Sequence, residues 1–178
     1  GFKQMSRLSQ IAKSIFLEST KEGGFVKGED FENYVERYIF PKEEYTLIYR
    51  TPNEAMNAER FVESSLYPDF QFRDKKTDKK FWVEVKYRQD SYKDKIMWAT
   101  EAQLKRYKEY DKKLPVFVAI GVGVYGKASM PDYFYIVPVK HIKYVGLFES
   151  FLNKYEIYNP DTKYPDKPIK SEKLWGLL

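Results

Sequence analysis

The segment Phe81–Tyr87 carries the residues best suited to chemistry, because it places an acid and a base on one side of an expected strand. Its sequence is Phe-Trp-Val-Glu-Val-Lys-Tyr, and successive side chains of a strand point to opposite faces. The odd-numbered positions are apolar or aromatic and form one face. Glu84 and Lys86 therefore project together from the other face.

A second strand is expected to begin at Asp69 and to form a hairpin with this one across the polar run 74–80. Placing Phe72 opposite Phe81 joins the apolar faces of both strands. Asp69 then lies opposite Glu84, with Cβ atoms about 5 Å apart. A register shifted by two residues would place Asp69 opposite a lysine instead, so two arrangements are open.

Facing carboxylates destabilise a sheet unless a cation lies between them. Mg²⁺ usually takes one or two carboxylates and keeps waters and substrate phosphate oxygens as its other ligands. Asp69, Glu84 and the backbone carbonyl of Val85 would supply such a set, and Lys86 would offset charge on a phosphorus centre. This constellation fits phosphodiester hydrolysis with Mg²⁺ or Mn²⁺. The alternative is an ordinary, weak ion pair on a solvent-exposed face.

The composition narrows the chemistry further. The chain has no cysteine, which excludes disulfides, iron–sulfur clusters, thiolate zinc sites and a cysteine nucleophile. Its single histidine, His141, excludes a multi-histidine metal site. A net charge of +5 is mild evidence for a polyanionic partner. The longest uncharged stretch, Leu114–Gly126, is too short to span a bilayer, and we expect a cytoplasmic protein.

The elements expected around these residues form one sheet with helices packed against it, in a single domain over residues 1–178. Helices are expected over 3–20, 28–40, 53–65 and 97–112, strands over 45–50, 69–74, 80–88, 115–122 and 132–139, and a short helix after Phe148.

Tyr67–Phe70 (Tyr-Pro-Asp-Phe), followed by Phe81–Lys86, resembles the signature of the PD-(D/E)xK nuclease superfamily, which has the restriction-endonuclease-like fold. The expected element order over 27–122 also resembles the αβββαβ core of that fold. Residues 1–26 would be an N-terminal helical extension, and 123–178 an added strand and C-terminal tail. The resemblance implies an α/β fold with a mixed central sheet flanked by helices.

The same resemblance implies a metal-dependent nuclease. Asp69 and Glu84 would bind Mg²⁺ or Mn²⁺ and Lys86 would be the catalytic lysine. DNA is the expected substrate, with RNA and a homodimeric assembly left open. Two other readings compete with this one: a catalytically inactive nucleic-acid-binding or assembly module with the same fold, and an unrelated α/β protein in which the pattern is coincidental.

Gln103–Tyr107 resembles the Q-x-x-x-Y element on the helix that follows the Glu-x-Lys strand in RecB-like nucleases. A spacing of four residues places Gln103 and Tyr107 on one helical face, and the resemblance implies a supporting catalytic role for both. The alternative for Gln103 is a capping box with Thr100. Some of these nucleases carry a cysteine-bound iron–sulfur cluster, which this chain lacks, so no subfamily follows from the motif.

Lys27–Glu32 resembles the first-helix motif of Holliday-junction resolvase-like members, in which a helical glutamate helps to hold metal. Glu32 lies at the border of the apolar stripe of its helix, from where it would reach the site. The alternative is a favourable charge in the first helical turn.

Basic side chains near the hairpin are expected to contact a nucleic-acid backbone. The alternative is a solvated hairpin tip without a partner. The residues assigned to this contact are Arg73, Lys75, Lys76, Lys80 and Arg88.

Overall fold

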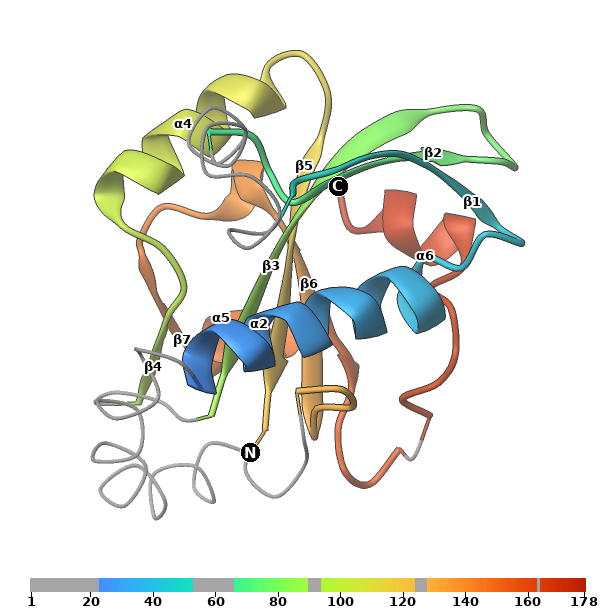
Figure 1. Ribbon diagram of the computed structural model, residues 1–178. Helices are drawn as coiled ribbons and strands as arrows, with labels where there is room; N and C mark the ends of the chain where they lie inside the picture. The colour runs from blue at the N-terminus through green and yellow to red at the C-terminus, as the bar shows by residue number, and fades with distance from the viewer. Residues whose placement is uncertain (1–22, 53–65, 90–93, 124–127, 163) are drawn as a thin grey trace.

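The computed structural model describes residues 23–52, 66–89, 94–123, 128–162 and 164–178, with side chains from Gly28 onward (Figure 1). The helices predicted over 3–20 and 53–65 lie outside these residues.

A six-stranded mixed sheet organises the described residues, in the order β1-β2-β3-β5-β6-β8, and a two-stranded sheet pairs β4 with β7. β3 and β5 are parallel, whereas the other neighbours in the large sheet are antiparallel. The predicted α/β class is confirmed.

The helical segments are α2 (Gly23–Tyr34), its π-helical continuation η1 (Val35–Ile39), α4 (Glu101–Asp111), η2 (Val139–His141), α5 (Glu149–Leu152), η3 (Asn153–Tyr155) and α6 (Ser171–Gly176). The strands are β1 (Tyr45–Arg50), β2 (Phe70–Asp74), β3 (Lys80–Arg88), β4 (Lys95–Met97), β5 (Val116–Val122), β6 (Tyr133–Pro138), β7 (Gly146–Phe148) and β8 (Glu156–Tyr158).

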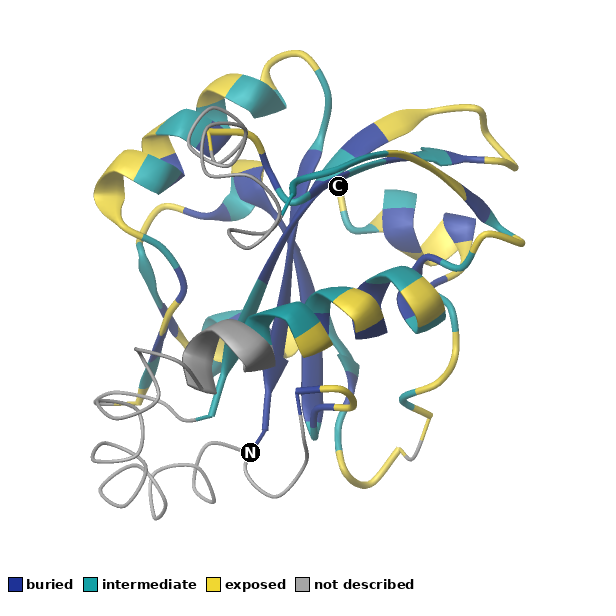
Figure 2. Ribbon diagram, viewed as in Figure 1, coloured by how far each residue is buried: buried dark blue, intermediate teal, exposed yellow. Residues whose placement is uncertain are grey.

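Both faces of the large sheet are covered, and its central strands are almost entirely buried (Figure 2). On one face the phenylalanines of β2 and β3 pack against α2, η1 and α6, and the rings of Phe40 and Phe72 stack with centroids 4.9 Å apart. On the other face Leu104 and Tyr107 of α4 pack against alternate valines and isoleucines of β5. The face that carries the charged residues of β3 is therefore not a simple solvent face.

The hairpin of β2 and β3 has the first of the two predicted registers. Phe72 is paired with Phe81 and Phe70 with Val83. This pairing ends at Val83 while β3 continues to Arg88, so the second half of β3 has no β2 neighbour. The resulting opening between the beginning of β2 and the middle of β3 is where both carboxylates lie.

The helix predicted over 97–112 begins later than the periodicity indicated. Residues 95–97 form β4, and α4 starts at Glu101. Thr100 explains the difference, because its side chain accepts a hydrogen bond from the backbone N–H of Gln103 and fixes the first turn. None of the described helices is long and apolar enough to cross a membrane.

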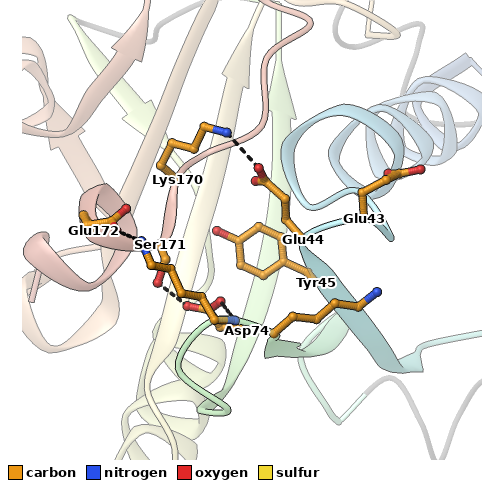
Figure 3. A pocket seen from close by; sticks show the side chains of 9 residues that line it. Glu43, Glu44, Tyr45, Asp74, Lys170, Ser171 and Glu172 are labelled. Carbon is orange, nitrogen blue, oxygen red and sulfur yellow. Dashed lines mark hydrogen bonds and ion pairs between the residues drawn. The ribbon is translucent and has the colours of Figure 1, made fainter.

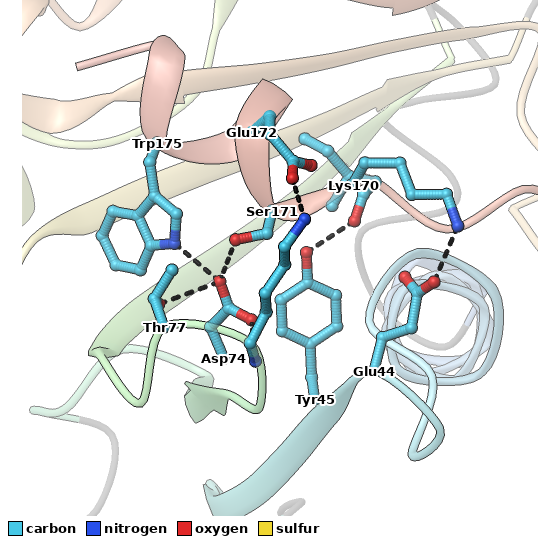
Figure 4. A network of polar contacts seen from close by, with 10 residues as sticks. Glu44, Tyr45, Asp74, Thr77, Lys170, Ser171, Glu172 and Trp175 are labelled. Atoms are coloured by element: carbon cyan, nitrogen blue, oxygen red, sulfur yellow. Dashed lines mark hydrogen bonds and ion pairs between the residues drawn. The ribbon is translucent and has the colours of Figure 1, made fainter.

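The tail is held to the β2–β3 hairpin by a buried carboxylate, Asp74 (Figure 4). Its Oδ2 atom accepts hydrogen bonds from the Ser171 hydroxyl, from the Trp175 indole N–H at 2.7 Å and from the Thr77 hydroxyl at 3.0 Å. Its Oδ1 atom accepts one from the backbone N–H of Lys76 at 2.9 Å. The network connects the hairpin to α6, about one hundred residues further along the chain.

This network predicts an acid-sensitive component of stability. Burial acts to raise the pKa of Asp74, but the hydrogen bonds from Ser171, Trp175, the backbone of Lys76 and Thr77 outweigh it and lower the pKa below its ordinary value of 3.8. The folded carboxylate thus binds its proton less readily than the unfolded one. Its stabilisation is present above about pH 4 and is lost as the pH falls through the folded pKa.

Urea midpoints measured between pH 6 and pH 2.5 test this dependence. The difference in midpoint between the wild type and Asp74→Asn should be largest near neutral pH and should shrink as the pH falls. A difference that stays constant across this range would contradict the assignment.

Candidate active site

Asp69 and Glu84 face each other at the opening between β2 and β3, as the hairpin register predicted. The backbone N–H of Asp69 donates to Glu84 Oε1 at 3.2 Å, and the backbone N–H of Val85 donates to Asp69 Oδ2 at 2.8 Å. Each carboxylate is thus oriented by the main chain of the other strand. The backbone carbonyl of Val85, the third predicted ligand, belongs to the residue that follows Glu84 in β3.

Glu84 lies beneath α4 with 4% of its surface exposed. Its Oε2 atom accepts a hydrogen bond from the Tyr107 hydroxyl at 2.6 Å and pairs with the Lys86 ammonium group at 3.2 Å. A buried carboxylate with two such partners is not the weak surface pair considered from sequence. Since Oε1 accepts one hydrogen bond from the backbone, it retains a lone pair for a further ligand.

Glu32 approaches the same carboxylates from α2, on the opposite face of the sheet. Its carboxyl group hydrogen-bonds with Asp69 and is close enough to Glu84 for the two charges to interact. Arg50, at the end of β1, pairs with Glu32 at 3.5 Å and with Glu36 at 2.9 Å. Burial raises the pKa of Glu32, while Arg50 partly opposes this increase.

The pKa of Asp69 is raised well above its ordinary value of 3.8. Desolvation is the largest cause, followed by the negative charge of Glu84 and a hydrogen bond with its carboxyl group; Glu32 adds to the effect and Lys86 opposes it. The negative charges of Asp69, Glu84 and Glu32 therefore repel one another and are only partly offset by Lys86. A cation is the natural way to relieve this excess.

Asp69 and Glu84 fit a hard divalent cation, which needs only one or two carboxylates when water and substrate complete its coordination. Among the described residues, no three acidic or histidine side chains are arranged to hold a metal ion together. The candidate ligand set is thus two carboxylates and a main-chain carbonyl, with Glu32 in contact with Asp69.

Gln103 has the geometry of the capping alternative. Its side-chain Oε1 atom accepts a hydrogen bond from the backbone N–H of Thr100 at 3.0 Å, while its own N–H donates to the Thr100 hydroxyl at 3.1 Å. Tyr107, one turn later on α4, contacts Glu84 directly. The structure therefore brings Tyr107 to the carboxylates and places Gln103 at the beginning of the helix.

Of the basic residues predicted to contact nucleic acid, four lie at the β2–β3 hairpin and one lies at the end of β3. Lys75, Lys76 and Lys80 are exposed at the hairpin, where Lys76 pairs with Glu172. Lys80 is four residues from Glu84 along β3, about 13 Å at the rise of a strand. Two arginines complete the set. Arg73 pairs with Asp78 at 3.6 Å, and Arg88 donates to the backbone carbonyl of Met97 at 2.7 Å, which connects β3 to β4.

Sequence reasoning did not identify two groups beside the site. One is Arg50, whose position at a strand end gave no signal of its pairing with α2. The other is the ring of Tyr49. A register shift between Leu47 and Tyr49 places Tyr49 opposite Gln71, and therefore on the same face of the sheet as Glu84. Regular alternation from Tyr45 would have placed Tyr49 on the opposite face, and the sequence offers no glycine that would have marked the irregularity.

A cavity of about 370 Å³ lies elsewhere, between the start of β1, the hairpin and α6 (Figure 3). Asp74, which lines it, belongs to the apolar face of β2, so this cavity is on the side opposite to Glu84. Its charges are largely paired, Lys170 with Glu44 at 2.8 Å and Lys76 with Glu172. It is therefore part of the contact that holds the tail and is separate from the carboxylate site.

Comparisons with known proteins give a structural match. No family model and no curated protein matches the sequence. A solved structure of Hjc, a Holliday junction resolvase from the archaeal hyperthermophile Archaeoglobus fulgidus, superposes with a TM-score of 0.50 at 15% sequence identity. The match covers 74% of this chain and 92% of the resolvase. The chain thus shares the fold of this resolvase, in line with the predicted mixed sheet flanked by helices.

Proposed function

We propose that this protein is a metal-dependent nuclease that hydrolyses phosphodiester bonds in DNA. The observation that carries the proposal is the buried carboxylate of Glu84, which is held by Tyr107 and Lys86 and faces Asp69 across the opening beside β3. A buried acid with this set of partners needs a functional explanation, because burying a charge is costly.

Each residue of the site would have a distinct role in the hydrolysis. Asp69 and Glu84 would hold Mg²⁺ or Mn²⁺ together with the Val85 carbonyl and with Glu32 in support. Such an ion, when bound, polarises a phosphodiester and lowers the pKa of a coordinated water. Lys86 has three N–H donors, one of which is directed at Glu84, so its ammonium group can also neutralise charge on a phosphate oxygen. Tyr107 keeps the Glu84 carboxylate in one orientation.

A second candidate function is a nucleic-acid-binding or assembly module that does not cleave. The observation that favours it is that the described residues hold no ready-made cluster of three metal-ligating side chains. In this reading Asp69 and Glu84 would be remnants of a site, and the exposed lysines of the hairpin would carry the binding.

Cleavage of a substrate panel tests the two functions against each other. The panel holds single-stranded, duplex, circular and branched DNA as well as RNA, each with Mg²⁺, Mn²⁺ or EDTA. Cleavage that requires a divalent ion and is absent in Lys86→Ala is the expected result. Salt-sensitive binding without cleavage under any of these conditions would favour the module.

Paired substitutions at the start of α4 separate the two roles of Gln103. If Gln103 acts only as a cap, Thr100→Ala and Gln103→Ala should each lower the free energy of unfolding by about 1 kcal/mol and leave cleavage of the folded protein unchanged. If Gln103 acts in catalysis, as its motif implies, Gln103→Ala should reduce cleavage at least about tenfold while Thr100→Ala does not. Single-turnover cleavage and urea denaturation of both variants provide the measurements.

A further inference from the structure

Four aromatic side chains form a cluster beside the carboxylates, and we refer to them as the aromatic cluster. They are Tyr49, Tyr67, Trp82 and Tyr110. Their ring centroids lie 5.6–6.2 Å apart, and the rings of Tyr67 and Trp82 are nearly parallel, at 12°. Tyr67 remains 41% exposed. The cluster therefore presents aromatic surface to an external molecule.

The aromatic cluster is continuous with the candidate active site along three elements. Trp82 precedes Glu84 by two residues on the same face of β3, a separation of about 7 Å. Tyr67 precedes Asp69 by two residues in the segment that leads into β2. Tyr110 follows the Glu84 partner Tyr107 by one turn of α4. A nucleotide whose phosphate reaches the carboxylates thus has aromatic rings within reach of its base.

Arg106 lies near both sets of residues and adds positive charge. Its guanidinium carbon is 5.8 Å from the ring centroid of Tyr107, and its charge acts on both Tyr107 and Tyr110. The Nε atom of Arg106 is buried, and the described part of the chain supplies no hydrogen-bond partner for it. Arg106 as a whole is only half-buried, and a planar guanidinium carries further N–H donors that suit the oxygens of a phosphate.

We propose that the aromatic cluster stacks on unpaired nucleobases and that Arg106 binds a phosphate of the same strand. The substrate class is then nucleic acid with a single-stranded segment at the cleavage position, because the bases of an intact duplex stack on one another and leave no face for a protein ring. This inference rests on the proposed function, since it assigns the substrate class of that same site.

Binding in EDTA tests the inference separately from cleavage. The probe is a 15-nucleotide mixed-sequence single strand that contains 2-aminopurine, compared with the same strand in a duplex. Wild-type protein should bind the single strand at least about fivefold more tightly and quench its fluorescence by stacking. Tyr67→Ala should weaken this binding about tenfold, whereas Tyr67→Phe, which keeps the ring, should not. Arg106→Ala should weaken binding and reduce its salt dependence by about one phosphate contact.

Tyr144→Ala is the matched control, because Tyr144 is 71% exposed and lies outside the cluster. Its binding should equal that of the wild type. The inference is overturned if the duplex binds as tightly as the single strand, or if Tyr67→Ala and Tyr110→Ala bind like the wild type. Trp82→Ala should also weaken binding, and if that variant does not fold, Tyr67→Ala and Tyr110→Ala decide the outcome. Metal-dependent cleavage measured in parallel shows whether the nuclease proposal survives such a failure.

Discussion

Replacing Glu84 with glutamine is expected to reduce metal-dependent cleavage at least about a thousandfold, which corresponds to about 4 kcal/mol of transition-state stabilisation. Glutamine has nearly the same shape and retains one oxygen that can accept from Tyr107. It removes the negative charge that faces Asp69 and that a divalent ion requires. Cleavage under single-turnover conditions, with Mg²⁺ and with Mn²⁺, measures the loss.

The fold should survive this substitution, because the variant removes one of several acidic groups that repel one another in the metal-free protein. Circular dichroism and the urea midpoint should therefore be close to those of the wild type. Glu109→Gln provides the control, since Glu109 lies on α4, is exposed and pairs with Lys112. Cleavage that persists in Glu84→Gln would show that the carboxylate at β3 is not the site of hydrolysis.

Asp74→Ala is expected to produce the largest loss of stability among the substitutions considered, about 3 kcal/mol or more. The substitution leaves the Ser171 hydroxyl, the Trp175 indole N–H and the Thr77 hydroxyl without their shared acceptor. The Ser171 hydroxyl is buried and the Trp175 indole is half-buried, and a buried donor that loses its partner costs about 1–3 kcal/mol, whereas the exposed Thr77 hydroxyl can bond to water instead. For a chain of this size, the melting temperature should fall by roughly 6–12 °C.

The same variant should loosen the C-terminal segment first, because Asp74 connects α6 to the hairpin. Hydrogen exchange should accelerate at residues 171–176 before it does so in β5. Ser171→Ala, which removes one donor together with its need for an acceptor, should cost about 1 kcal/mol. Asp161→Ala, at an exposed position, should have no measurable effect. Equal effects of Asp74→Ala and Asp161→Ala would refute the role assigned to the buried carboxylate.

The hairpin and its two carboxylates could be predicted because their determinants are local. Side chains alternate along a strand with a period of two, so the sequence of Phe81–Tyr87 assigns Glu84 and Lys86 to one face. A short connection then allows few registers, and matching phenylalanines selects the one observed. The position of Asp69 opposite Glu84 follows without knowledge of any other element.

The sequence also led to the correct fold, through the order of its elements and its motifs. The start of α4 was predicted too early because helical periodicity continues through residues 97–100, whereas the cap at Thr100 determines where the helix begins. The same cap uses the side chain of Gln103. The four-residue spacing of Gln103 and Tyr107 suggested that both belong to the site, but the position of Gln103 is also explained by its role in the cap.

Only the tertiary structure decided how the predicted residues are surrounded. Whether Glu84 is a surface acid or a buried one depends on α4, which packs over β3 and brings Tyr107 to it. The pairing of Arg50 with Glu32, and the contact of α6 with Asp74, join residues 18 and about one hundred positions apart. Local periodicity contains no information on such contacts, because they depend on how separately formed elements pack. The sequence thus determined which residues form the site. The burial of Glu84, the balance of charges around it and the aromatic residues beside it depend on how the elements pack around the sheet.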